Sequence, residues 1–242
     1  MSSSPFLSVV VPAYNETERL RRNQVRFQKF FSERDFSWEL ILVDDGSQDE
    51  THRCLDGFFP EDRFRVLRNP VNRGKGYSVR RGVMQASGKR VLVTDADLST
   101  PLEECDKLFR ALDEGEDIAI GSRALRDSEV TRHQAWYREG MGKFFNLLVQ
   151  GLVLPGLWDT QCGFKCFKRE TAGPLFEIMT LDGFCFDVEF LFLARRRGLN
   201  IREIPVHWEN DVNSRVDLVQ DSLRMFRDLF RIRWNLLRGL YD

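Results

Sequence analysis

The regular alternation of short apolar runs with longer segments of helical periodicity is the feature that most constrains the fold. The runs are rich in Val, Ile and Leu and end at Gly, Pro or Asp, which is typical of buried strands. We expect strands over residues 7–11, 38–43, 64–67, 91–94 and 118–120, with helices over 16–31, 49–58, 74–86 and 102–112 between them. Repeated units of this length predict an α/β chain with a mostly parallel central sheet flanked by helices.

The second half of the chain is less regular. Residues 128–154 mix basic, aromatic and apolar side chains at helical spacing, and we expect further helices over 186–197 and 216–241. Short strands are expected over 165–167 and 201–208, where Pro205 indicates the edge of a sheet. Since no linker, repeat or low-complexity segment interrupts the chain, residues 1–242 are predicted to form a single domain.

Three polar clusters, at residues 12–16, 44–47 and 95–97, follow the ends of predicted strands. Ligands bind at that edge in open α/β sheets. The carboxylates of Asp95 and Asp97 repel each other unless a cation lies between them, and Mg²⁺ or Mn²⁺ holding phosphates would satisfy both. Asp45 and Tyr14 suit a nucleoside, as hydrogen-bond acceptor and stacking partner. The alternative is that these residues only form turns and caps.

Composition narrows the classes of partner. The net charge of −1 provides no basic field for nucleic acid, so any anion site must be local. The cysteines are odd in number and follow no secretory signal, which favours a reduced, cytoplasmic setting. Cys162 and Cys166 lack the partners of a zinc site. No stretch of about twenty apolar residues occurs, so we expect no span across a bilayer.

The polar clusters carry a resemblance to a known family. Pro12-Ala13-Tyr14-Asn15-Glu16, Val43-Asp44-Asp45-Gly46-Ser47, Asn72-Arg73-Gly74-Lys75-Gly76 and Thr94-Asp95-Ala96-Asp97 resemble motifs of the inverting family 2 glycosyltransferases, which have the Rossmann-like GT-A fold. Motifs at residues 121–123, 159–165, 186–189, 203–206 and 213–215 resemble those of dolichyl-phosphate β-glucosyltransferases and other polyprenyl-phosphate sugar transferases. The resemblance covers nearly the whole chain.

The resemblance implies a role for each matching residue. It implies a nucleotide-sugar-binding half over residues 6–122, an acceptor-binding half over 123–215 and an amphipathic interfacial helix over 216–242. Donor-binding positions are Pro12, Tyr14, Glu16, Val43, Asp45, Lys75, Asp95, Ala96 and Asp97, with Asp95, Asp97 and Ser99 as the metal set. Acceptor-binding positions are Arg123, Arg138, Asp159, Asp187, Ser214 and Arg215, of which the three arginines act in catalysis with Asp95 and Asp97.

Physical chemistry supports these roles. A lipid monophosphate has a second pKa near 6 and is a competent nucleophile at neutral pH without a general base. Arginine presents a planar fork that binds phosphate oxygens in pairs and can align the attacking oxygen. A metal ion stabilises the charge that grows on the departing diphosphate. If the acceptor were instead a sugar hydroxyl, Asp187 or another carboxylate would be needed as base, whereas Glu189 is expected to face solvent.

The closing helix mixes bulky apolar side chains with arginines, a pattern typical of helices at a membrane surface. Packing against the core is the alternative explanation. We therefore expect an enzyme at the cytosolic face of a membrane that moves a hexose, most simply glucose from UDP-glucose, to a polyprenyl phosphate. GDP-mannose as donor, a sugar hydroxyl as acceptor and a non-enzymatic nucleotide-sugar-binding module are the alternatives. A homo-oligomer is also compatible with the sequence.

Overall fold

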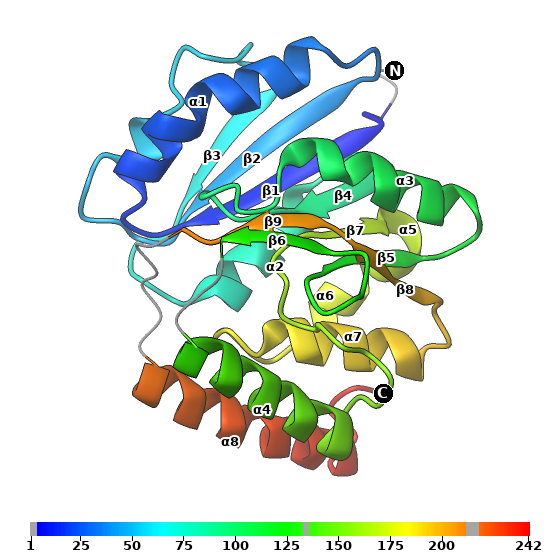
Figure 1. The fold of residues 1–242 in the computed structure, drawn as a ribbon. Helices are drawn as coiled ribbons and strands as arrows, with labels where there is room; N and C mark the ends of the chain where they lie inside the picture. Colours follow the sequence, from blue (N-terminus) through cyan, green and yellow to red (C-terminus); the bar gives the residue numbers. More distant parts are fainter. Residues whose placement is uncertain (1–3, 133–135, 212–217) are drawn as a thin grey trace.

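The computed structural model describes residues 4–132, 136–211 and 218–242, together with the side chains of 4–131, 139–211 and 220–242. A seven-stranded sheet forms its centre, in the order β3-β2-β1-β4-β7-β5-β8 (Figure 1). The strands are β1 (Leu7–Ala13), β2 (Trp38–Asp44), β3 (Phe64–Arg68), β4 (Arg90–Val93), β5 (Ile118–Ser122), β7 (Lys165–Lys168) and β8 (Ile201–Pro205). All neighbours pair in parallel except β7, which is antiparallel to β4 and β5. The predicted mostly parallel sheet is confirmed.

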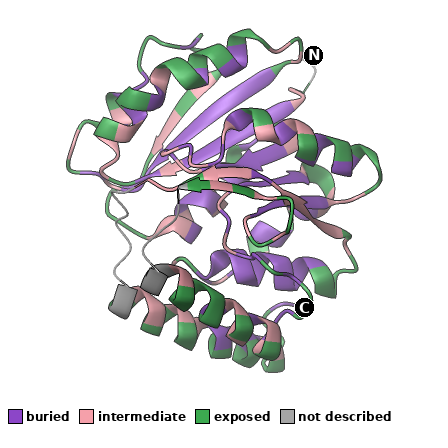
Figure 2. Ribbon diagram, viewed as in Figure 1, coloured by how far each residue is buried: buried purple, intermediate pink, exposed green. Residues whose placement is uncertain are grey.

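Helices cover both faces of the sheet, and alternate side chains of each strand point to different cores. On β1, Val9 and Val11 pack beneath α1 (Thr17–Ser32) and α3 (Cys105–Asp113). Val10 points to the opposite face, where α2 (Lys75–Gln85) and α7 (Phe186–Arg196) lie. All three valines are fully buried, and Figure 2 shows the central strands of the sheet buried between the two helical layers. This double cover explains why the strands read as continuous apolar runs.

Two long helices, α4 (Trp136–Leu152) and α8 (Leu218–Leu237), form an outer layer beyond α7 (Figure 1). A two-stranded ladder joins β6 (Glu129–Arg132) to β9 (His207–Glu209), and the short helices are η1 (Thr51–Arg53), η2 (Leu102–Glu104), α5 (Arg169–Ala172) and α6 (Leu175–Ile178). Within the described residues, no helix has the length and apolar character needed to cross a membrane.

Two elements depart from expectation. The helix predicted over 49–58 is wrong, because only the single turn η1 forms there. The Asp49 carboxylate accepts hydrogen bonds from the amide and the hydroxyl of Thr51 and so fixes a tight turn, and Gly57 then takes a positive φ of 73°. The strand predicted over 201–208 divides after Pro205 into β8 and β9, which belong to different sheets. β8 is an edge strand, as Pro205 predicted.

Candidate active site

A cavity of about 860 Å³ opens at the carboxyl ends of β1, β2 and β4. Most of the predicted donor and metal residues line it: Pro12, Tyr14, Glu16, Asp45, Lys75, Asp95, Ala96, Asp97 and Ser99. Val43 does not reach the cavity, because it lies fully buried in β2. Folding of the parallel sheet therefore brings the three polar clusters to one edge, as their positions after strand ends predicted.

Asp95 and Asp97 lie in the turn that follows β4. The Lys75 ammonium lies 2.6 Å from Asp95 Oδ1. Burial alone would raise the pKa of Asp95, but the adjacent Lys75 charge outweighs it and lowers that pKa. Burial and the charge of Asp95 raise the pKa of Asp97, although Asp97 Oδ1 accepts a hydrogen bond from the Ser99 amide at 2.9 Å. This pair of mutually repelling carboxylates is an electrostatically favourable place for a cation.

Gly163 allows the Asp95 side chain to occupy its position. A Cβ atom added at Gly163 would lie 2.1 Å from Asp95 Oδ2, which is shorter than any ordinary contact. The glycine lies in the motif at 159–165, far from Asp95 in the sequence. Nothing in the sequence pattern indicated this contact, because it depends on β7 pairing with β4.

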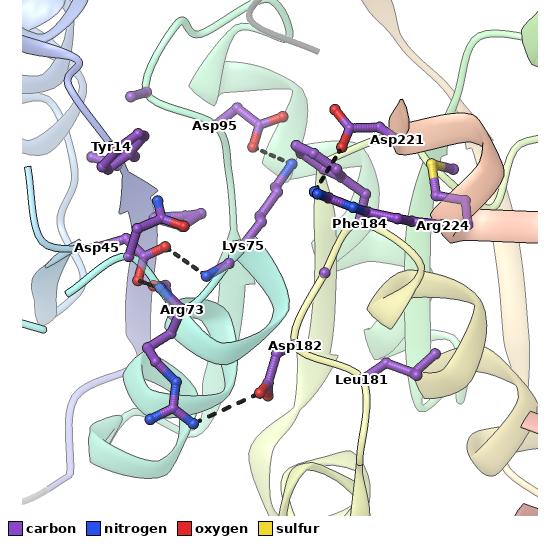
Figure 3. Close-up of a pocket in the computed structure, with 18 of the residues that line it drawn as sticks. Tyr14, Asp45, Arg73, Lys75, Asp95, Leu181, Asp182, Phe184, Asp221 and Arg224 are labelled. Carbon is purple, nitrogen blue, oxygen red and sulfur yellow. Dashed lines mark hydrogen bonds and ion pairs between the residues drawn. The ribbon is translucent and has the colours of Figure 1, made fainter. Parts of the chain in front are cut away.

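Asp45 shapes the basic loop that precedes α2. Its carboxylate accepts hydrogen bonds from the amides of Arg73 at 3.0 Å and Gly74 at 2.7 Å (Figure 3). It also accepts one from Asn69 Nδ2 at 2.6 Å. Gly74 has a φ of 107°, and a Cβ there would lie 2.4 Å from the carbonyl oxygen of Asp182. The loop is thereby held against residues 180–184, and Lys75 is directed towards Asp95.

Three of the predicted acceptor residues, Arg123, Asp159 and Asp187, take part in two ion pairs, the first half-buried and the second buried. Arg123 binds Asp159 through a two-pronged contact, with Nε 2.7 Å from Oδ2 and Nη2 2.8 Å from Oδ1. Burial opposes ionisation of Asp159, but Arg123 outweighs it and lowers the pKa of the carboxyl. Arg123 is not among the described residues that line the cavity.

Asp187 forms the second pair, with Lys165 Nζ 2.7 Å from its Oδ1, and the side chains of both residues are almost completely buried. Burial raises the pKa of Asp187 despite this neighbour. The side chain of Arg138 and the whole of Ser214 and Arg215 lie outside the described residues.

Glu189 does not face solvent, so that expectation is wrong. It is fully buried and accepts hydrogen bonds from the Thr180 amide at 3.0 Å, the Leu181 amide at 2.8 Å and the Tyr241 hydroxyl at 2.6 Å. Asn235 on α8 donates a further bond to Thr180 Oγ1 at 2.8 Å. The network ties the end of the chain to the loop at 180–184, which lines the cavity.

Helix α8 supplies a wall of the cavity that the sequence motifs did not identify. Its contributing residues are Asp221, Arg224, Met225, Arg227, Asp228 and Arg231. Figure 3 shows Arg224 and Asp221 beside Phe184, across the cavity from Tyr14 and Asp45. The arginines were visible in the sequence, but only their helix packing aims them at the site.

An acidic pair and a basic loop at the carboxyl edge of a parallel sheet define a site for a phosphorylated ligand held partly through a cation. The sequence model of Glycosyl transferase family 2 matches residues 8–173. The chain belongs to this family, as its motifs indicated.

Curated relatives are similar in sequence to almost the whole of this chain. The dolichyl-phosphate β-glucosyltransferase of Dictyostelium discoideum is 36% identical over 249 residues, covering 98% of this chain and 76% of the relative. The enzyme of the same name from Saccharomyces cerevisiae is 36% identical and covers the same shares of both chains, 98% and 76%. The human enzyme of that name is 34% identical, covering 99% of this chain and 78% of the relative.

Solved structures confirm the predicted GT-A fold. Glucosyl-3-phosphoglycerate synthase from Mycobacterium tuberculosis, in complex with UDP, superposes with a TM-score of 0.72 at 22% identity, covering 94% of this chain and 80% of that one. The same enzyme with Mn²⁺, UDP and glucosyl-3-phosphoglycerate has a TM-score of 0.69 at 21% identity, and the match covers 96% of this chain and 79% of that one.

Proposed function

We propose that this protein is an inverting glucosyltransferase that moves glucose from UDP-glucose to a polyprenyl phosphate such as dolichyl phosphate. The observation that carries the proposal is the joining, in one cavity, of the acidic pair after β4 with the basic wall of α8. One end suits a nucleoside diphosphate held through a cation and the other suits a second phosphate. The names of the curated relatives support the same donor sugar and acceptor.

The donor lies along the edge of the sheet in this proposal. Pro12, Tyr14 and Asp45 face the nucleoside, and Lys75 binds the diphosphate. Asp95 and Asp97, with Ser99, fit a divalent cation, and the described residues contain no cluster of three acidic, His or Cys side chains that could hold one alone. The donor phosphates would therefore complete the coordination. Bound Mg²⁺ or Mn²⁺ would supply a Lewis acid that stabilises the departing UDP.

The acceptor phosphate attacks the anomeric carbon from the face opposite UDP. A bond forms between a phosphate oxygen and that carbon while the bond to the UDP oxygen breaks, so the configuration inverts. The phosphate is already ionised and needs no base, which agrees with the burial of Asp187 against Lys165. Arg224, Arg227 and Arg231 of the α8 wall face this phosphate, and Arg138, Ser214 and Arg215 are the further positions that the sequence motifs assign to it. Asp159 holds the fork of Arg123 next to this region, outside the described lining of the cavity.

Helices α4 and α8 dock on the cytosolic face of a membrane in this proposal. Large apolar side chains are exposed along both, at Met141, Phe144, Leu147, Leu223, Phe226, Phe230, Trp234 and Leu237. On α8 they recur at helical spacing and alternate with arginines, which suits anionic headgroups. Flotation with vesicles containing anionic lipid tests this: Phe230→Ser should weaken binding, and a wild-type protein that instead dimerises without binding vesicles would contradict it.

The activity is tested by incubating purified protein with polyprenyl phosphate, Mn²⁺ or Mg²⁺ and either UDP-glucose or GDP-mannose. We expect chloroform-extractable sugar from UDP-glucose. If product formed only from GDP-mannose, the donor would be GDP-mannose and not UDP-glucose. Donor binding without product under any condition would favour a nucleotide-sugar-binding module.

A further inference from the structure

Asp228 on α8 differs from the other carboxylates that line the cavity. Lys75 lies against Asp95, Arg80 binds Asp182 at 2.9 Å, and the Ser99 amide donates to Asp97. Asp228 makes no hydrogen bond or close ion pair with any residue in the described part of the chain. Burial and, to a smaller extent, the charge of Glu189 raise its pKa, while the charges of Arg231 and Arg227 act in the opposite direction. Its carboxylate is thus available to a ligand.

The position of Asp228 is fixed from both sides. The next residue, Leu229, and Ile232 are fully buried, so this turn of α8 is anchored in the core. Further along the helix, Asn235 is hydrogen-bonded to Thr180, at the start of the cavity loop 180–184. Asp228 Oδ2 lies 4.0 Å from the place where a Cβ on Gly183 would stand. The carboxylate is therefore held beside this loop and does not depend on a flexible surface turn.

Charge decides which part of a ligand can face Asp228. An ionised carboxylate only accepts hydrogen bonds, and it repels phosphate oxygens. The proposed donor and acceptor carry three phosphates, so Asp228 requires a neutral, hydroxyl-bearing group. The ribose lies at the opposite end of the proposed donor site, near Tyr14 and Asp45. The remaining neutral group with hydroxyls is the sugar that is transferred.

We infer that Asp228 accepts a hydrogen bond from a hydroxyl of the transferred hexose and contributes to selection of the donor sugar. The inference rests on the proposed function, since it takes the ligand to be a nucleotide-sugar. It places the sugar between the acidic turn after β4 and α8. Arg231 and Arg227, beside Asp228 on α8, favour its ionised form, in opposition to the effects of burial and of Glu189 on its pKa.

Calorimetric binding of UDP-glucose and of UDP, each with Mn²⁺ in excess, tests the role of Asp228. Asp228→Ala should weaken UDP-glucose binding about tenfold, the loss expected for one hydrogen bond to a charged acceptor, and leave UDP binding unchanged. Asp228→Asn should give a smaller loss because it keeps one acceptor oxygen. Glu177→Ala on α6 is the control, because this exposed carboxylate does not line the cavity. It should leave the ratio of the two affinities unchanged.

Deoxyglucose donors identify the hydroxyl. Wild-type protein should lose affinity for one UDP-deoxyglucose, and Asp228→Ala should show no further loss with that same analogue. Equal weakening of UDP and UDP-glucose in Asp228→Ala, or no weakening of either, would overturn the role of Asp228 and leave the proposed function standing. Absence of UDP-glucose binding by the wild-type protein would instead count against the proposed function.

Discussion

Replacing Gly163 with alanine separates catalysis from stability. The new Cβ would stand 2.1 Å from Asp95 Oδ2, and real Cβ atoms essentially never approach other atoms within 3.0 Å. The carboxylate must therefore move by roughly 0.9 Å. The fold should survive, because the atom in contact is the end of a side chain and not backbone. A misplacement of about 1 Å in a catalytic group can reduce the rate by about 10²-fold, so we expect a loss of this size in turnover.

The assay compares initial rates of glucosyl transfer, the Mn²⁺ concentration for half-maximal rate and the thermal midpoint. Gly163→Ala should lose rate and require more Mn²⁺, with a thermal midpoint close to that of the wild type. Gly151→Ala on α4 is the control, because a Cβ there meets nothing within 4 Å. Turnover of Gly163→Ala within twofold of wild type would refute the reasoning that this glycine makes room for Asp95.

Other residues give further predictions. Asp97→Asn should reduce turnover by at least about 10²-fold, measured as the initial rate at saturating Mn²⁺, and near-normal turnover would remove its metal role. Glu189→Ala should lower the free energy of unfolding in urea by about 3 kcal/mol, since it leaves buried donors unsatisfied, and Tyr241→Phe by about 1 kcal/mol. The pKa of Asp159 is lowered in the folded state, because Arg123 outweighs burial. Its stabilisation is therefore present above the unfolded pKa of about 3.9 and lost as pH falls through the folded pKa. Asp159→Asn should reduce this loss of stability at acid pH, measured as the free energy of unfolding in urea at several pH values. An unchanged slope of that free energy against pH would contradict the pairing.

The first half of the fold was predictable because its strands are buried on both faces. Runs such as Val9 to Val11 carry apolar residues in succession, a pattern that fits no amphipathic element. The region around Asp49 was not predictable as a turn, since its helical composition is overridden by the side-chain bonds of that single residue to Thr51. Local composition cannot reveal such competition.

The candidate site was predictable only where it follows strand ends. Asp45, Asp95 and Asp97 come together because parallel strands end at one edge. The contributions of Gly163 and Asp228 depend instead on contacts between segments far apart in the chain. Glu189 was misjudged for the same reason: its partners, Thr180 and Tyr241, lie on different segments.

The stereochemistry of the lipid product tests the central claim most directly. Purified protein is incubated with UDP-glucose, Mn²⁺ and a polyprenyl phosphate, and the anomeric configuration of the extracted product is determined by proton NMR. Because the sugar of UDP-glucose is α-linked, single displacement by the acceptor phosphate should give a β-glucosyl phosphate lipid. An α-linked product, or the absence of any glucosylated lipid, would contradict the account.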